Sequence, residues 1–224
     1  GVFVSRFVST NALSSINIVY PIINIVLGLS VMLSTGSSAI VAKKMGEGRP
    51  DSARGTFTMI IMLNIAAGLV IAILGNLFAT PLSLLLGSSE VLLKDCVTYL
   101  RWQLAFAPAL MLQIQFQMYF VTEGRPGIGL FLTLLAGVTN AVLDYVLIVP
   151  MGLGIAGAAI ATAIGEVIGG VVPILYFSRK NNSLLRLTRT RFDGRVLLKT
   201  CANGASEMVT NLSMSIVNIL YNFQ

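Results

Sequence analysis

The chain contains several apolar stretches that are each longer than the roughly 18 residues a membrane-spanning helix requires. Hydrophobic residues make up 55% of its 224 residues, whereas charged residues make up only 11%. A soluble domain carries roughly 25% charged residues, and here the charges gather in short segments between the apolar stretches. The sequence therefore predicts an all-α, polytopic membrane helix bundle.

Seven apolar segments follow one another along the chain, and the first of them is only the end of a span. At about 1.5 Å per residue, each complete segment can cross the ~30 Å hydrocarbon core of a bilayer. The predicted segments are residues 1–8, 12–42, 56–79, 96–120, 128–149, 155–177 and 201–224. Residues 80–94 are too short and too interrupted to span, so we expect a turn of helix at the membrane surface there.

The basic residues are distributed unevenly over the loops. Twelve of the fifteen Lys and Arg residues follow the second, fourth and sixth segments, and these alternate loops must share one side of the membrane. Basic loops are retained on the cytoplasmic side, so this side is predicted to be cytoplasmic. The net charge of +6 does not indicate a nucleic-acid partner, because nucleic-acid binding needs basic residues gathered on one soluble face.

Residues 178–200 form a long basic segment that separates six apolar segments from the seventh. We expect a cytoplasmic linker that lies on anionic lipid. It divides the chain into a transmembrane unit of residues 1–177 and the start of a second unit, residues 201–224. The sequence has no initiator Met and stops inside an apolar segment, so we expect the carboxyl-terminal half of the same chain to be missing.

Sequence motifs for enzymes are lacking. The chain has no histidine, no GxxxxGK[ST] loop and no GxSxG elbow. Gly152, Gly154 and Gly157 match GxGxxG, but that motif binds dinucleotides only between a strand and a helix. Small residues recur every four positions from Gly157 to Gly169 and instead predict a face for close helix packing. We expect neither an enzyme nor a cofactor.

One span carries an acidic residue on a polar face. An ionisable side chain inside the bilayer costs at least about 2.5–3.5 kcal/mol on insertion scales, so it is a functional-site hypothesis by default. At about 100° per residue, Thr133, Gly137, Asn140 and Asp144 fall within roughly 60° of one another on a helix. Asn140 and Asp144 are i,i+4 neighbours and can contact the same ion or water. Asp144 has no basic partner in any span, so we predict a functional role for it.

The next span supplies companions for Asp144. Thr162 is predicted at the same depth, and Glu166 follows it on the same face near the midplane. Burial disfavours the charged form of an acid, so Asp144 can bind and release a proton near neutral pH. Alternatively it stays ionised and holds Na⁺ with oxygen ligands from Asn140 and Thr162. No other metal site is expected.

Further polar residues are candidates for a substrate cavity. Asn17, Pro21 and Asn24 share a stripe of the second segment, and Gln113 and Gln117 share a face of the fourth. Interhelical hydrogen bonding is the simpler role for Asn and Gln in a membrane bundle. Pro21 is also compatible with a tolerated kink.

These segments resemble the MATE family of multidrug and toxic compound extrusion transporters, in particular its DinF-like branch. The resemblance covers essentially the whole chain and is most specific in the fifth and sixth segments. It is carried by GVFVSRFVSTNALSSINIVYPIINIVLGLS, AKKMGEGRPDSAR, NAVLDYVLIVPMGLGIAGAAIATAIGE and NGASEMVTNLSMSIVNIL.

The resemblance implies the amino-terminal lobe of a two-lobed, twelve-helix transporter that works by alternating access. It implies that Asn140, Asp144 and Thr162 form a cation site, with Tyr99 as a weaker match. Glu166 stands where the family often has an uncharged polar residue, so its role in binding a cation or proton is left open.

We therefore expect a secondary antiporter of the cell membrane that exports amphipathic, often cationic small molecules in exchange for H⁺ or Na⁺. One alternative is a flippase for lipid-linked oligosaccharides of the same superfamily, which would need a cavity rich in Arg and Lys. The other is an integral-membrane enzyme, which would need a cluster of nucleophile, base or metal ligands at the interface. The spans show neither feature.

Overall fold

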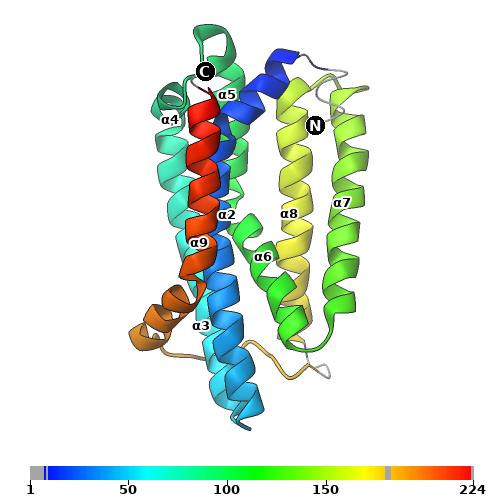
Figure 1. Ribbon diagram of the computed structural model, residues 1–224. Helices are drawn as coiled ribbons and strands as arrows, with labels where there is room; N and C mark the ends of the chain where they lie inside the picture. Colours follow the sequence, from blue (N-terminus) through cyan, green and yellow to red (C-terminus); the bar gives the residue numbers. More distant parts are fainter. Residues whose placement is uncertain (1–7, 9, 180–182, 223–224) are drawn as a thin grey trace.

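The computed structural model describes residues 8, 10–179 and 183–222, and every regular element within these residues is a helix (Figure 1). The predicted end of a span at residues 1–8 lies outside the described residues, apart from Val8. The helices are α2 (Thr10–Gly46), α3 (Pro50–Leu77), α4 (Ala79–Leu85), α5 (Glu90–Ala105), α6 (Ala107–Thr122), α7 (Pro126–Ile148), α8 (Gly154–Ser178) and α9 (Gly194–Asn222).

Four helices, α2, α3, α7 and α8, are each long and apolar enough to cross a membrane. Their bounds differ from the predicted segments by no more than six residues at either end. The bent pair α5 and α6 provides a fifth span. The prediction of a polytopic membrane helix bundle is confirmed.

The span predicted over residues 96–120 is present as a bent pair of helices, and the sequence analysis did not predict the bend. The structure breaks this segment between α5 and α6, whose axes differ by 53°. Pro108 lies in the first turn of α6, where it has no backbone N–H to continue the hydrogen-bond ladder of α5. The bend packs against α3 at Gly68, where an added Cβ atom would lie 2.5 Å from the Pro108 Cα atom. A glycine on a neighbouring helix thus makes room for the kink.

Helices α5 and α9 both begin several residues before the predicted starts of their spans, in stretches that contain charged residues. The expected surface turn is present as α4, but residues 90–94 belong to α5. Helix α9 begins at Gly194, before the predicted start of the last span at residue 201. Residues 194–200 include Arg195 and Lys199, so their composition is that of a loop although they are helical. In Figure 1 this first part of α9, in orange, bends away from the red remainder.

Small residues allow the closest helix contacts. Cβ atoms at Gly157 and Gly165 of α8 would lie 3.2 Å from carbonyl oxygens of α7, those of Leu147 and Ala136. A Cβ atom at Gly169 would lie 2.6 Å from the Gln113 side chain of α6. The predicted small-residue face of α8 is confirmed.

Helix α9 lies against α2 along most of its length (Figure 1). An added Cβ atom at Gly36 would collide with the Thr200 carbonyl oxygen, and one at Gly204 with the Met32 carbonyl oxygen. The two backbones therefore approach each other through a reciprocal pair of glycines.

The basic loops share one end of the bundle. The α2–α3 corner, the α6–α7 turn and the segment before α9 all lie at the lower end in Figure 1. The Arg54 Nε atom donates to the Leu184 carbonyl oxygen at 2.9 Å, and the Thr188 N–H donates to Thr58 Oγ1 at 3.0 Å. Residues 183–193 are therefore hydrogen-bonded across the end of the lobe that carries the other basic loops, as predicted for alternate loops on one side.

Candidate functional site

A groove of about 410 Å³ lies between α6, α7 and α8, with Leu27 of α2 at its edge. Among the described residues that line it there is no Arg or Lys. Its polar side chains come from three helices and are Gln113, Gln117, Thr133, Asn140, Thr162 and Glu166. The groove is therefore amphipathic, and its one ionisable group is a carboxyl.

Asn140 and Thr162 join α7 to α8 at this groove. The Asn140 Nδ2 atom donates to Thr162 Oγ1 at 3.3 Å, and the Thr162 hydroxyl donates to the Ala158 carbonyl oxygen at 3.0 Å. Gly165 lies beside this pair, and a Cβ atom there would lie 3.2 Å from the Ala136 carbonyl oxygen, which is a tight contact between α8 and α7. The Asn140 amide oxygen is left available as an acceptor for a ligand.

Asp144 lies one helical turn beyond Asn140 on α7 and is half-buried. Its Oδ1 atom is buried and has no hydrogen-bond partner within the described part of the chain. Asp144 does not line the groove itself. The structure thus brings Asn140 and Thr162 into contact and places Asp144 on the adjoining turn.

Glu166 is the second acid of this region. It lies one turn from Thr162 on α8, is only 7% exposed and lines the groove. Its Oε2 atom has no hydrogen-bond partner among the residues that the structure describes. A buried carboxylate oxygen without a partner is rare in structural roles, because it carries the full desolvation cost.

Tyr99 on α5 completes the set of predicted ion-site residues. It is 8% exposed, and its hydroxyl accepts a hydrogen bond from Gln103 Nε2 at 3.4 Å. Tyr99 is not among the described residues that line the groove.

Gln113 and Gln117 of α6 both line the groove. The Gln117 Nε2 atom donates to Thr133 Oγ1 at 2.8 Å, so this pair links α6 to α7. Gln113 packs on Gly169 of α8. Gln117 therefore lines the groove and also bonds between helices, whereas Gln113 lines the groove and packs against α8. Their role in a substrate cavity stays a prediction.

A buried polar network on the other side of α6 escaped the sequence analysis. Gln115 accepts from Asn64 Nδ2 at 3.0 Å and donates to Ser37 Oγ at 3.1 Å, and the Tyr119 hydroxyl donates to the same Ser37 oxygen at 3.1 Å. This network ties α2, α3 and α6 together. The signal was present as isolated polar residues in apolar spans, but nothing in one sequence pairs them.

The three candidates on α2 do not reach the groove. Asn17 is exposed, whereas Pro21 and Asn24 are buried outside the groove lining. Gly28, on the same stripe, faces α9, because an added Cβ atom would lie 2.9 Å from the Asn211 Cβ atom. At Gly28 the stripe therefore serves helix packing.

A multi-carboxylate metal centre is not found in the described residues, where no three His, Cys, Asp or Glu side chains come together. The oxygen ligands near Asp144 are one carboxylate, one amide and one hydroxyl. Hard cations are held by oxygen ligands of these types. Their chemistry fits either a proton on the carboxyl or an alkali cation beside it.

Comparison with known proteins identifies the family. The MatE family profile matches residues 1–146, which is more than half of the chain. The chain belongs to the MatE family. The resemblance to MATE transporters is thereby confirmed, whereas the DinF-like branch stays a prediction.

Relatives of this MatE chain are named as export proteins. Multidrug export protein MepA of Staphylococcus saprophyticus is 26% identical over 225 residues, which cover 98% of this chain and 49% of the relative. MepA of Staphylococcus haemolyticus is 25% identical over 182 residues, which cover 81% of this chain and 40% of the relative. The MatE chain spans about half the length of the curated relatives it matches.

Solved MATE structures show the same fold. An inward-facing multidrug resistance MATE family transporter of the MOP superfamily superposes with a TM-score of 0.91 at 22% identity, covering 98% of this MatE chain and 50% of its own. An outward-facing structure of such a transporter superposes with a TM-score of 0.89 at 22% identity, covering 96% of this MatE chain and 48% of its own. The MatE chain is a multi-pass membrane protein with the fold of one half of these transporters.

Proposed function

We propose that this chain is the amino-terminal lobe of a secondary antiporter that exports amphipathic, often cationic compounds in exchange for H⁺ or Na⁺. The names of the MepA relatives support multidrug export. The observation that carries the proposal is a pair of acids inside the bundle, Asp144 and Glu166, each with a carboxylate oxygen that has no partner among the described residues.

A change of charge at Asp144 supplies the coupling step. When Asp144 takes up a proton or binds Na⁺, its negative charge is neutralised inside an apolar bundle. Asn140 and Thr162 adjoin it and bridge α7 to α8, so the event is felt at a helix interface. A local change of charge of this kind can bias two packings of the same helices.

The groove suits amphipathic cations. Leu27, Leu110 and Ile114 offer apolar contact, while Glu166 provides a negative charge without a competing base among the described lining residues. In its deprotonated form this carboxylate attracts an organic cation strongly, because solvent screening is weak in the groove. The same composition disfavours the oligosaccharide flippase, whose phosphate-bearing substrate needs Arg and Lys.

Alternating access requires that this lobe move as a unit against a second lobe around a shared cavity. The lobe superposes almost equally well on an inward-facing and an outward-facing MATE structure, with TM-scores of 0.91 and 0.89. This supports a rocking motion in which the fold of each lobe is preserved.

A transport assay with separated gradients tests the proposal. The natural-length protein is reconstituted into liposomes, and the amphipathic cation ethidium is followed by fluorescence under an imposed pH gradient or an imposed Na⁺ gradient. We expect accumulation against the ethidium gradient with one of the two ions and its collapse when that gradient is dissipated. Equal ethidium movement with and without either gradient would overturn the antiporter.

A further inference from the structure

A separate hollow of about 190 Å³ lies at the inner end of the bundle, between the α2–α3 corner and the segment that leads into α9. It is distant in the fold from the groove of α6, α7 and α8, and it shares no lining residue with it. Its polar and charged lining includes Lys44, Thr56, Thr190, Arg191 and Asp193.

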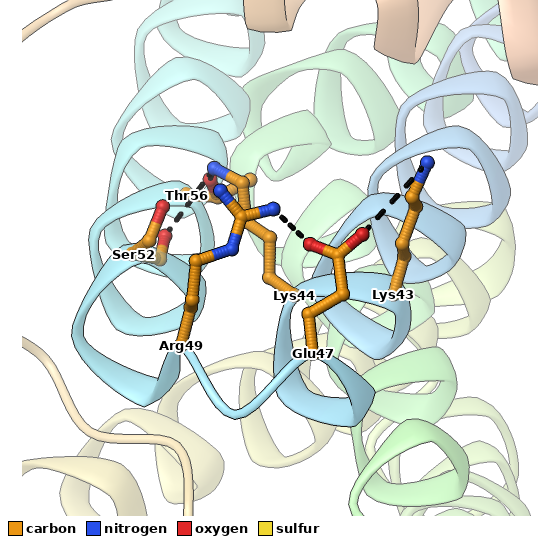
Figure 2. Close-up of polar contacts among 6 residues, drawn as sticks. All are labelled: Lys43, Lys44, Glu47, Arg49, Ser52 and Thr56. Atoms are coloured by element: carbon orange, nitrogen blue, oxygen red, sulfur yellow. Dashed lines mark hydrogen bonds and ion pairs between the residues drawn. The ribbon is translucent and has the colours of Figure 1, made fainter.

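Lys44 is held in a fixed position at this hollow. Its ammonium donates to Thr56 Oγ1 at 2.7 Å and to the Ser52 carbonyl oxygen at 3.5 Å (Figure 2). The Thr56 side chain is buried on α3, with 4% of the residue exposed. An ammonium has three N–H donors, so one donor is left for a further acceptor.

Lys44 forms no ion pair with a carboxylate of the described residues. Lys43 and Arg49 both pair with Glu47 in Figure 2, whereas no ion pair of Lys44 is found in the described part of the chain. Glu47 is thus engaged by two other bases. The positive charges of Arg49 and Lys199 act against the charge of the Lys44 ammonium, whereas the negative charge of Asp193 favours it.

Arg191 brings a second cation from the opposite wall, and no ion pair of Arg191 is present within residues 8, 10–179 and 183–222. Asp193 opposes these charges, but its Oδ1 atom already accepts the backbone N–H groups of Arg195 at 2.9 Å and Val196 at 3.4 Å at the start of α9. The hollow therefore has two cations without an ion pair among the described residues, against one carboxylate that is already hydrogen-bonded.

We propose that this hollow binds a phosphate group, held between Lys44 on α2 and Arg191 on the segment before α9. Phosphate oxygens accept charge-assisted hydrogen bonds from Lys and Arg, which are shorter and stronger than neutral ones. The hollow lies at the end of the bundle that carries the basic loops, where anionic lipid headgroups are attracted by juxtamembrane Lys and Arg. A bound phosphate would tie the inter-helix segment 183–193 to the α2–α3 corner.

The test uses short-chain phosphatidic acid (dihexanoyl) and inorganic phosphate as probes on the detergent-purified, natural-length protein. Thermal unfolding midpoints are measured as each probe is titrated, and the saturable rise gives an apparent dissociation constant. The double variant Lys44→Gln/Arg191→Gln removes both cations, while the amide introduced at position 44 can still donate to Thr56. Arg195→Gln, at the start of α9, is the control, because it removes one exposed positive charge that does not line the hollow.

We expect each charge removed from the hollow to weaken phosphatidic acid binding about fivefold, whereas the control changes it less than twofold. If inorganic phosphate binds as tightly as phosphatidic acid and is weakened by the same variants, the bound group is a free phosphate. Much weaker inorganic phosphate binding identifies the lipid headgroup. Equal binding by the wild type, the double variant and the control overturns the proposal, as does the lack of saturable stabilisation by either probe. Arg191→Gln alone repeats the comparison if the double variant does not fold, since the Arg191 side chain has an exposed position.

Discussion

The carboxyl group of Asp144 is the group on which ion coupling should depend. Asp144→Asn keeps the size and hydrogen-bonding capacity of the side chain and removes only the titratable charge. We expect ion-driven ethidium efflux to fall to the background of empty liposomes, with expression and membrane insertion near normal. Removing an unpaired buried charge also removes its desolvation cost, so stability should not suffer.

The control for this substitution is Glu90→Gln at the exposed start of α5, which should transport at the wild-type rate. Wild-type efflux by Asp144→Asn under the same gradient would show that the cation-site assignment is wrong. Glu166→Gln would then be the next variant to test, because Glu166 lines the groove and also has a carboxylate oxygen without a hydrogen-bond partner among the described residues.

Asn140 and Thr162 should have smaller effects than Asp144. Asn140→Ala and Thr162→Val each delete one neutral ligand and the hydrogen bond between α7 and α8. A hydrogen bond of this kind contributes about 1 kcal/mol, so we expect the half-saturating ion concentration to rise about fivefold in each variant. Thr98→Val is the matched control, because its hydroxyl bonds the Lys94 carbonyl oxygen away from the groove. An unchanged ion dependence in both variants would remove Asn140 and Thr162 from the site.

Helical periodicity predicted part of this site. It placed Asn140 and Asp144 on one face of α7, and the structure brings Asn140 to Thr162. Periodicity could not show that Asp144 lies outside the groove lining or that Asn24 turns away from it. Those facts depend on how each helix is rotated against its neighbours, and for α2 the neighbour is α9, which contacts it at Gly28.

The break between α5 and α6 illustrates why proline alone does not predict a kink. Pro21 and Pro173 lie inside α2 and α8, and both helices continue through them. At Pro108 the chain bends, and there the bend is seated on Gly68 of α3. The deciding contact joins residues forty positions apart in sequence, so a local pattern could not reveal it.

Gly68→Ala should therefore destabilise the bundle. The added Cβ atom would lie 2.5 Å from the Pro108 Cα atom, which is backbone and cannot rotate away. Overpacking of this kind costs about 1–3 kcal/mol, and it should appear as a lower free energy of unfolding in detergent. Gly127→Ala in the first turns of α7 meets nothing within 4 Å and should leave that free energy unchanged or slightly raised. Equal stabilities of the two variants would mean that the kink does not depend on Gly68.

The turn between α6 and α7 should make stability depend on pH. The Glu123 side chain is 1% exposed, and burial raises the pKa of its carboxyl above the ordinary 4.5, although the Ser183 hydroxyl and the Arg125 guanidinium partly oppose this. The folded state therefore binds the proton more tightly than the unfolded state. The protonated Glu123 carboxyl therefore contributes to stability in full below pH 4.5, and this contribution is lost as the pH rises through the raised pKa. Glu123→Gln should flatten the fall of the thermal midpoint with pH, and parallel curves for variant and wild type would contradict this.

The arrangement of the whole lobe was the most predictable property, because it follows from one physical requirement. Each span must satisfy its backbone hydrogen bonds within the bilayer, so apolar segments of sufficient length become helices. The basic residues then fix which loops lie together, and the α2–α3 corner, the α6–α7 turn and the segment before α9 do meet at one end (Figure 1). The contacts of residues 183–193 with α3 and α8 could not be predicted, because they depend on single backbone groups. The Leu187 N–H, for example, donates to the Phe177 carbonyl oxygen.

Single-cysteine labelling tests which end of the lobe faces the cytoplasm. In the natural-length protein with its native cysteines replaced, a cysteine introduced at Ser52 or at Arg189 should react with a membrane-impermeant maleimide only from the cytoplasmic side. A cysteine introduced at Ser89, before α5, should react only from outside. All three positions are exposed, so accessibility does not limit the reaction.

Twelve of the fifteen basic residues lie on the side of Ser52 and Arg189. The opposite orientation of the lobe would place these residues outside the cell, against the rule that basic loops are retained in the cytoplasm. Between Ser89 and Arg189 the chain crosses the membrane three times, through the bent pair α5 and α6, through α7 and through α8. Labelling of the Ser89 and Arg189 variants from the same side would therefore contradict this number of spans.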